Sequence, residues 1–292
     1  VEGLVGASLD AGVNFLDTAD VYSDGESERL LGQALAALGR PRESLVVATK
    51  VRGRTGPGVN QVGLSRGHIL ASVDASLKRL GLEHIDLYQT HWIDPGVPIE
   101  ETLSALTDLV RRGYVRYLGC SNYSAWRLMQ ALWASDKGGF ERFVSIQPEY
   151  SIASPTRANF EREIARVCES YGVGVIPYSP LAGGFLTGKY ERDGAQPEST
   201  RAGEIAKNRF TEQNWAILDR LREVAAAHDV PVAQVSLAWL LSKPYMSAPI
   251  VGANSAEQLG ELMPAATLHL TPEELAALDE VSGWVRSRTE KR

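Results

Sequence analysis

Four polar residues, at or shortly after the ends of apolar runs, have the side chains needed to reduce a carbonyl group. Asp17, Lys50 and His91 each end a short apolar run, and Tyr22 lies in the segment after Asp17. Hydride arriving at a carbonyl carbon builds negative charge on the oxygen, which requires a proton donor within hydrogen-bond reach. Tyr22 could donate that proton, a Lys50 ammonium would favour its release, and Asp17 would keep a buried lysine charged. His91 could donate to the carbonyl oxygen and orient the substrate.

Two other interpretations of these residues stay open. Any one of these polar groups, buried at a strand end, could be part of a structural ion pair. Tyr22 taken alone could be an exposed loop tyrosine without a catalytic role. Their occurrence together, at the same end of consecutive units, favours catalysis. Lys50 could instead form a Schiff base with its substrate, as in a lyase. The presence of Asp17, Tyr22 and His91 beside it argues against this.

The elements that would position these residues alternate along the whole chain. The first six short β-branched runs recur about 30 to 40 residues apart, which is the length of one strand plus one returning helix. This rhythm is typical of a parallel sheet with helical crossovers. We expect strands at residues 13–19, 45–51, 85–92, 117–122, 145–150, 174–180 and 248–254.

Helical periodicity and end signals occupy the intervening stretches. From Ser65, a suitable N-cap, apolar residues recur every three to four positions until Gly81. Further helices are expected from residue 4, from Pro98, from Ser124, over 157–171, from Thr211, from Pro231, and from Ser255 and Thr271, which open S-x-x-Q and T-x-x-E capping boxes. Residues 183–208 are rich in glycine and charge and are expected to form a long functional loop.

Strand–helix units over 292 residues favour a (β/α)8 TIM barrel. An open doubly wound sheet with a nucleotide site would show a G-x-G-x-x-G turn after its first strand, and the sequence has none. Seven strands are expected rather than eight, and a barrel lacking one strand would leave two unpaired edges. We therefore predict that strand one is missing from this chain, and that residues 1–292 form a single domain.

Composition restricts the partners of the chain. The 30 basic and 36 acidic residues give a net charge of −6 without basic clusters, so nucleic acid is not expected as a partner. No apolar run approaches the length of a membrane span, and we predict a cytoplasmic protein without membrane association. Only two cysteines and five dispersed histidines are present, which predicts no disulfide framework and no metal site. The oligomeric state is not indicated.

Six stretches, in this order, resemble the aldo-keto reductases: NFLDTADVYSDGESERLLG, VVATK, IDLYQTHW, YLGCSN, IQPEYS and IPYSPLAGGFLTGKY. The likeness runs from residue 1 nearly to the last helix. It implies that Asp17, Tyr22, Lys50 and His91 occupy the positions of the family's catalytic tetrad. The chain would then be an oxidoreductase that transfers a hydride from NADPH to an aldehyde or ketone, on a TIM barrel that binds NADP(H) without a Rossmann domain.

The resemblance also assigns cofactor-binding residues. Ser121, Asn122 and Gln147 match residues that hold the nicotinamide carboxamide, and Tyr178 matches the aromatic residue that stacks on the ring. The segment that would approach the pyrophosphate contains Ser179, Pro180, Leu181, Gly183 and Lys189. The adenosine end is assigned to Arg201, Gly252, Asn254, Gln258 and Glu261, with the helix that opens at Ser255 receiving the 2′-phosphate.

Three expectations complete the picture. Asn254 stands where many family members have Lys or Arg, and Leu262 where Asn is common, so Arg201 is the remaining cation for a 2′-phosphate. Trp92, beside His91, is expected to line an apolar pocket for a small carbonyl substrate. A non-catalytic role also stays open, because some relatives of this family bind NADP(H) as regulatory or sensor subunits with little turnover.

Overall fold

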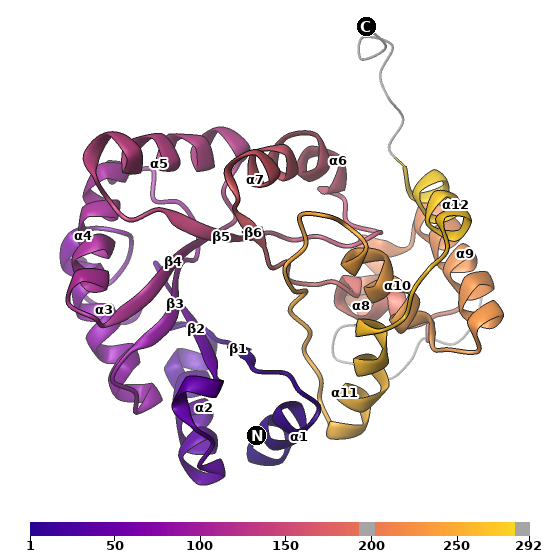
Figure 1. The fold of residues 1–292 in the computed structure, drawn as a ribbon, viewed down its shortest axis with the longest axis horizontal. Coiled ribbons are helices and arrows are strands. Elements are labelled where there is room, and N and C mark those ends of the chain that lie inside the picture. The colour runs from indigo at the N-terminus through magenta and orange to yellow at the C-terminus, as the bar shows by residue number, and fades with distance from the viewer. Residues whose placement is uncertain (193–201, 284–292) are drawn as a thin grey trace, which may run out of the picture. The chain divides into compact units, whose positions relative to one another are not determined.

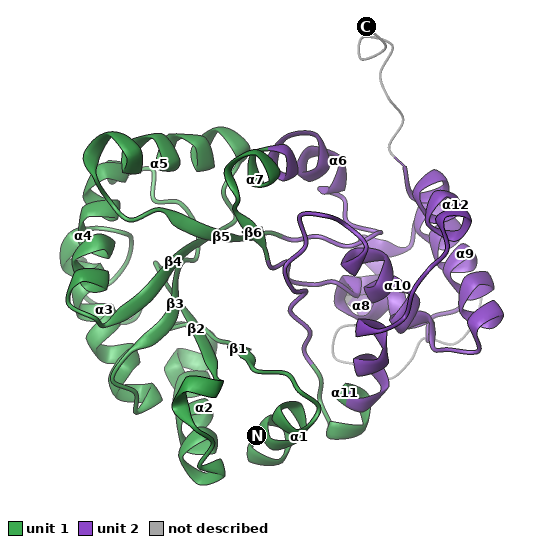
Figure 2. Cartoon of the chain, in the orientation of Figure 1, with its two compact units in different colours: residues 1–148, 167–175, 253–259 green, residues 149–166, 176–252, 260–292 purple. Residues whose placement is uncertain are grey.

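The chain forms two compact units in a computed structural model that describes residues 1–192 and 202–283. Unit 1 comprises residues 1–148, 167–175 and 253–259. Unit 2 comprises residues 149–166, 176–252 and 260–292 (Figure 2).

Unit 1 is built on a parallel sheet of six strands (Figure 1). The strands are β1 (Phe15–Asp17), β2 (Val46–Val51), β3 (Ile85–Thr90), β4 (Val115–Ser121), β5 (Phe143–Gln147) and β6 (Gly174–Val175). They pair in sequence order, each parallel to the next. The predicted α/β class with a parallel sheet is therefore confirmed, and each connection between neighbouring strands is a crossover.

The helices of this unit follow the expected end signals. They are α1 (Glu2–Asp10), α2 (Glu26–Leu38), α3 (Arg66–Leu80), α4 (Ile99–Arg111) and α5 (Ala125–Gly138), with the 3-10 turns η1 (Tyr22–Gly25) and η2 (Arg42–Ser44). Helix α3 begins where the Ser65 hydroxyl accepts the N–H of His68, and it ends at Gly81, whose φ is +66°. Helices α2 to α5 lie along one side of the sheet (Figure 1).

Alternation along the strands separates the polar residues of the sheet into two groups. Thr49 faces the helices, because its hydroxyl donates to Oε1 of Glu28 on α2 at 2.5 Å. Its neighbour Lys50 consequently points to the opposite face. The strand register places four more residues on the same face as Lys50. Each of them is paired with a residue of this face on a neighbouring strand, or lies two positions from such a residue. They are Asp17, Gln89, Ser121 and Gln147.

One strand prediction is wrong, and the predicted bounds of another strand and of one loop differ from those observed. Residues 248–254 form no strand: Ile250 donates its N–H to the Pro177 carbonyl at 2.8 Å, but Pro249 has no N–H to continue a ladder. The strand expected at 174–180 is shorter than predicted. It ends as β6 at Val175, because Pro177 has no backbone N–H to continue the pairing. The segment expected to be a loop at 183–208 instead contains the 3-10 turn η4 (Ala182–Thr187) and helix α8 (Ala202–Arg209). The basic residues of α8 lie in its last turn, where positive charge stabilises a helix.

Unit 2 is mostly helical. Its elements are α6 (Arg157–Asn159), the π-helical turn η3 (Phe160–Ile164), η4, α8, α9 (Glu212–His228), α10 (Val232–Leu241), η5 (Met263–Ala266) and α12 (Pro272–Ser282). Helices α7 (Ala165–Tyr171) and α11 (Ala256–Leu262) each contribute residues to both units. The capping box predicted at Thr271 is present, with both reciprocal hydrogen bonds to Glu274. The single helix expected over 157–171 is interrupted by η3.

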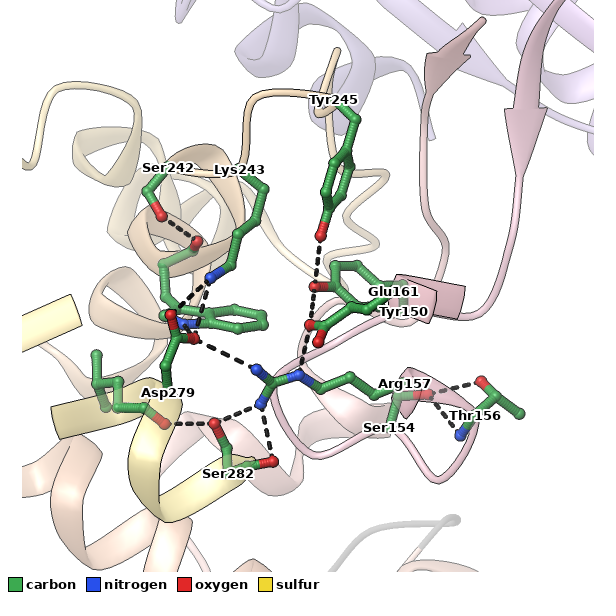
Figure 3. Close-up of polar contacts among 12 residues, drawn as sticks. Tyr150, Ser154, Thr156, Arg157, Glu161, Ser242, Lys243, Tyr245, Asp279 and Ser282 are labelled. Atoms are coloured by element: carbon green, nitrogen blue, oxygen red, sulfur yellow. Dashed lines mark hydrogen bonds and ion pairs between the residues drawn. The ribbon is translucent and has the colours of Figure 1, made fainter. Parts of the chain in front are cut away.

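A partly buried ion-pair network joins α12 to the start of α6 within unit 2 (Figure 3). Arg157, only 6% exposed, donates to Glu161 at 2.6 Å and to Asp279 at 3.3 Å. Asp279 also accepts from Lys243 at 3.0 Å and from the indole N–H of Trp239 at 2.9 Å. The charges inside this network are thus neutralised, and they anchor the last described helix to the unit.

No single helix in the described residues is long and apolar enough to cross a membrane. Helices α9 and α10 reach the required length and composition only when taken together, and they are bent by 99° at the break between them.

Candidate active site

Lys50 is the centre of a hydrogen-bonded cluster at the carboxyl end of β2. Its side chain is fully buried, and Nζ donates to Asp17 Oδ2 at 2.5 Å, to the Thr18 carbonyl at 2.8 Å and to the Tyr22 hydroxyl at 3.3 Å. An ammonium group has three N–H donors, and all three are engaged here. This set of acceptors stabilises the charged form of Lys50 away from water.

Asp17 connects Lys50 to two glutamines on the same face of the sheet. Asp17 Oδ1 accepts from Gln89 Nε2 at 3.0 Å and from Gln147 Nε2 at 3.1 Å, while Oδ2 binds Lys50. The carboxylate is therefore held in one orientation by three donors. Sequence reasoning missed Gln89. Its signal was a polar side chain inside a run of strand residues, which is costly to bury unless it is hydrogen-bonded.

Tyr22 lies at the start of η1 and is 40% exposed. The next three residues, Ser23, Asp24 and Gly25, have φ angles of 49°, 55° and 84°. Left-handed serine and aspartate are uncommon, and such backbone strain concentrates at functional sites. Because the Tyr22 hydroxyl oxygen accepts from Lys50, its own O–H remains able to donate to another acceptor.

His91 follows β3 and is buried against two aromatic rings. Its ring centroid lies 5.6 Å from that of Tyr22, edge to face, and 4.0 Å from that of Trp92, with which it stacks. Burial, together with the positive charges of Lys50 and Arg52, lowers the pKa of His91 to about 3. The imidazole is therefore neutral at neutral pH, so one ring nitrogen donates and the other accepts. Nδ1 is buried and has no hydrogen-bond partner among the described residues.

Ser121, Asn122 and Gln147 form a connected polar edge beside His91. The Ser121 hydroxyl donates to the Gln147 carbonyl at 2.6 Å, and Asn122 Nδ2 donates to the His91 carbonyl at 3.1 Å. Asn122 has a φ of 59°, a left-handed conformation that asparagine tolerates well. Gln147 Oε1 accepts no hydrogen bond from any described residue. This edge therefore presents an amide oxygen that an N–H group of a ligand could use.

A second polar system, on the helix side of the sheet, supports the turn that carries Tyr22. Glu28 is fully buried and accepts from Thr49 at 2.5 Å and from Arg79 Nε at 2.6 Å. Arg79 packs on Gly25, where a Cβ would lie 2.9 Å from its Cδ. Gly25 is thus required both for its φ and for this close approach. The turn after Tyr22 is consequently fixed to β2 and to α3.

Asp20 is a buried carboxyl group beside this system that sequence reasoning also missed. Neither of its carboxyl oxygens has a hydrogen-bond partner among the described residues. Burial, reinforced by the negative charge of Glu28, raises the pKa of Asp20 from 3.8 to about 7. Asp20 therefore titrates near neutral pH, and the folded chain retains its proton where an unfolded chain has lost it.

We expect Asp20→Asn to stabilise the chain more at about pH 8 than at about pH 5. Unfolding releases the Asp20 proton when the pH lies between 3.8 and about 7, so the wild-type chain loses stability as the pH rises through this window. The amide carries no such penalty. Melting temperatures at the two pH values test this, with the exposed Asp24→Asn as the control. An equal change at both pH values would contradict it.

The segment assigned to the ring and pyrophosphate of the cofactor belongs to unit 2. Tyr178 forms an isolated parallel bridge with Glu149. Residues 179–181 lead from it into η4, and Ser179 has a φ of 55°. Gly183 and Gly184 have φ angles of 71° and 104°, and a Cβ built at Gly184 would lie 3.5 Å from Lys189 Nζ. The Lys189 ammonium therefore lies against a glycine turn, an arrangement suited to an anion. Pro180, Leu181 and the other residues named here keep their roles as predictions.

Two of the residues assigned to the adenosine end, Asn254 and Gln258, contact each other. Gln258 donates its N–H to the Ser255 hydroxyl at 3.2 Å, while its Oε1 accepts from the Asn254 N–H at 3.0 Å. The predicted S-x-x-Q box therefore closes on Asn254 rather than on Ser255. The Glu261 carbonyl accepts from Gln234 at 2.6 Å, and Gly252 lies in an irregular segment. Arg201 lies outside the described residues.

Over residues 1–192 and 202–283, no three His, Cys, Asp or Glu side chains are grouped so that they could hold a metal ion. Both cysteines, Cys120 and Cys168, are free and buried. Burial raises the pKa of Cys168 to about 12, which makes its thiol unreactive at neutral pH.

Comparison with known proteins gives one family match over nearly the whole chain. The model of the Aldo/keto reductase family matches residues 2–282. Versiconal hemiacetal acetate reductase of Aspergillus parasiticus is 36% identical over 296 residues, covering 95% of this chain and 85% of that protein. The aldo-keto reductase AFTS1 of Alternaria alternata is 36% identical over 294 residues, covering 93% of this chain and 79% of that protein.

A protein with a different kind of name is similarly close. A putative voltage-gated potassium channel subunit beta of Schizosaccharomyces pombe is 38% identical over 282 residues, covering 93% of this chain and 81% of that protein.

Proposed function

The chain belongs to the aldo/keto reductase family, and from this membership we propose that it reduces an aldehyde or ketone with NADPH. The family supports an oxidoreductase and implies a (β/α)8 barrel. We propose that barrel for this chain, as a single domain over residues 1–292, and the six parallel strands in sequence order support it. The observation that carries the proposed activity is the Asp17–Lys50–Tyr22 chain of hydrogen bonds beside a neutral His91.

NADPH, when bound, would supply the hydride. The polar groups of the chain fit a nicotinamide: Gln147 Oε1 is an acceptor without a partner among the described residues, and Ser121 and Asn122 adjoin it. We propose that these three residues hold the carboxamide. Lys189 and the Gly183 turn fit the pyrophosphate, because a cation lies against backbone with positive φ. The remaining cofactor assignments are Tyr178, Ser179, Pro180, Leu181, Arg201, Gly252, Asn254, Gln258 and Glu261, which rest on the family resemblance.

Tyr22 is proposed as the proton donor to the carbonyl oxygen. Lys50 donates to the Tyr22 oxygen, so it stabilises the negative charge left on the phenol when the proton departs. Asp17 keeps Lys50 charged and oriented. His91, neutral and carrying one N–H, can donate to the same carbonyl oxygen. Trp92, 43% exposed and stacked on His91, is proposed as an apolar wall for a small carbonyl substrate.

The relatives named as potassium channel β subunits favour a second candidate, an NADP(H)-binding regulatory or sensor subunit. NADPH fluorescence and carbonyl-dependent NADPH oxidation, measured on the same sample, separate the two. Binding with turnover supports the reductase, whereas binding without turnover on a broad set of carbonyls supports the sensor. The Schiff-base lyase gains no support, because all three donors of the Lys50 ammonium are engaged.

Lys189→Ala is expected to weaken NADPH binding roughly 10- to 100-fold, because it removes a charged donor to phosphate. A fluorescence titration measures this. Lys207→Ala, which removes an exposed lysine of α8, is the matched control and should leave the affinity unchanged. Equal affinities of the Lys189 variant and the wild type would remove Lys189 from the cofactor site.

A further inference from the structure

We propose that Arg52 binds a carboxylate on the substrate, so that the preferred substrates of this chain are carbonyl compounds that carry a carboxylate group. This inference rests on the proposed carbonyl reduction and specifies its substrate class. Four properties of Arg52 support it. They are its position at the carboxyl end of the sheet, its strained backbone, its guanidinium group, which is unpaired among the described residues, and the effect of its charge on His91.

Arg52 lies at the carboxyl end of the sheet, between the elements that carry His91 and Tyr22. The residue before it, Val51, accepts the backbone N–H of His91 at 2.9 Å. The residue after it is Gly53, where a Cβ would lie 2.1 Å from Cγ1 of Val21, the residue that precedes Tyr22. The Arg52 backbone is consequently fixed next to both proposed proton donors.

The backbone of Arg52 is strained. Its φ is 137°, a conformation that side chains with a Cβ rarely adopt and that glycine adopts readily. Its carbonyl accepts the N–H of Gly63 at 2.9 Å, which holds this conformation in place. An arginine at such a position indicates a use for the side chain, since the turn itself would form more easily with glycine.

Within residues 1–192 and 202–283, the Arg52 guanidinium group has no anion to pair with. Among the described residues, no side chain or carbonyl makes a hydrogen bond or ion pair with it, and Nε is buried without a partner. Arg54, on the same loop, instead donates to the carbonyls of Gly56 and Gly58. The carboxylate of Asp17 is engaged by Lys50 and two glutamines. A planar guanidinium with a desolvated N–H matches a carboxylate, which accepts two parallel hydrogen bonds.

The charge of Arg52 reaches the site. It is one of two cations that, after burial itself, lower the pKa of His91. The other cation is Lys50, whose charge Asp17 neutralises. Arg52 is therefore the cation near His91 whose charge is left for a ligand.

Paired substrates test this inference. We would measure kcat/KM with NADPH for 4-formylbenzoate and for the neutral, nearly isosteric 4-formylbenzamide. In Arg52→Met we expect kcat/KM for the benzoate to fall about 10- to 100-fold, mainly through KM, with little change for the benzamide. Arg52→Gly, which relieves the backbone strain, should show the same selective loss. Arg54→Met is the control and should retain the wild-type preference.

Equal losses on both substrates, or no loss on the benzoate, would overturn the carboxylate site while leaving the reductase intact. A calorimetric titration with 4-(hydroxymethyl)benzoate gives a readout that needs no turnover. If neither aldehyde is reduced by any form, the proposed function fails, yet binding of this acid to the wild type and its loss in Arg52→Gly would still support the site. Equal binding to both forms would end the proposal.

Discussion

Tyr22→Phe is expected to lower kcat for NADPH-dependent carbonyl reduction by about 10²- to 10⁴-fold, with little change in NADPH affinity. The substitution removes one oxygen, which is the atom that accepts from Lys50 and would donate to the carbonyl. The ring, its edge contact with His91 and the turn after it are retained. The measurement is single-turnover reduction with saturating NADPH, alongside a fluorescence titration of the cofactor.

Tyr114→Phe is the matched control, because Tyr114 is 39% exposed, close to the 40% of Tyr22, and lies after α4, away from the carboxyl end of the sheet. It should leave both quantities unchanged. Retention of wild-type kcat by the Tyr22 variant would rule out the phenol as the proton donor. A parallel loss of cofactor affinity would instead indicate a role in binding.

Asp17→Leu is expected to lower the free energy of unfolding by about 3 to 5 kcal/mol and to abolish turnover. The change leaves the fully buried Lys50 without its anion and leaves Gln89 and Gln147 without their shared acceptor. Urea denaturation followed by fluorescence and circular dichroism gives the stability and tests for a single transition.

The double variant Asp17→Leu with Lys50→Met separates charge from packing. It should recover part of the lost stability, because no unpaired charge remains buried, while turnover stays absent. Asp10→Ala is the control, since it removes an exposed partner of Arg40 and should cost at most about 1 kcal/mol. A single variant at Asp17 that is as stable as this control would show that Lys50 does not depend on Asp17.

The sequence predicted the sheet and its crossovers well where local signals were strong. The β-branched runs before Asp17, Lys50 and His91 became β1, β2 and β3, although the expected bounds were wider than the strands. The helix starts at Ser65 and Thr271 were readable because each cap is a contact between residues three positions apart. The contacts among Asp17, Lys50, Tyr22 and His91 followed from the rule that carboxyl ends of parallel strands converge.

The features that were missed depend on contacts between distant residues. Gln89 and Asp20 looked like ordinary strand and loop residues, and only the fold brings Gln89 to Asp17 and buries Asp20 near Glu28. The strand expected at 248–254 does not form. The prediction rested on the apolar composition of this segment and gave too little weight to Pro249, which has no backbone N–H to donate. The strained φ of Arg52 has no local signature, because arginine is not a residue associated with that conformation.

Successive residues on β2 serve different layers of unit 1. Thr49 holds the Glu28 and Arg79 system on the helix side, while Lys50 holds Asp17 and Tyr22 on the other side. A mutational library could therefore randomise positions of the Lys50 side to search for altered substrate range while the scaffold behind it stays constant. Positions that can vary to change the chemistry and positions that must stay constant to keep the scaffold are therefore neighbours on β2, one residue apart.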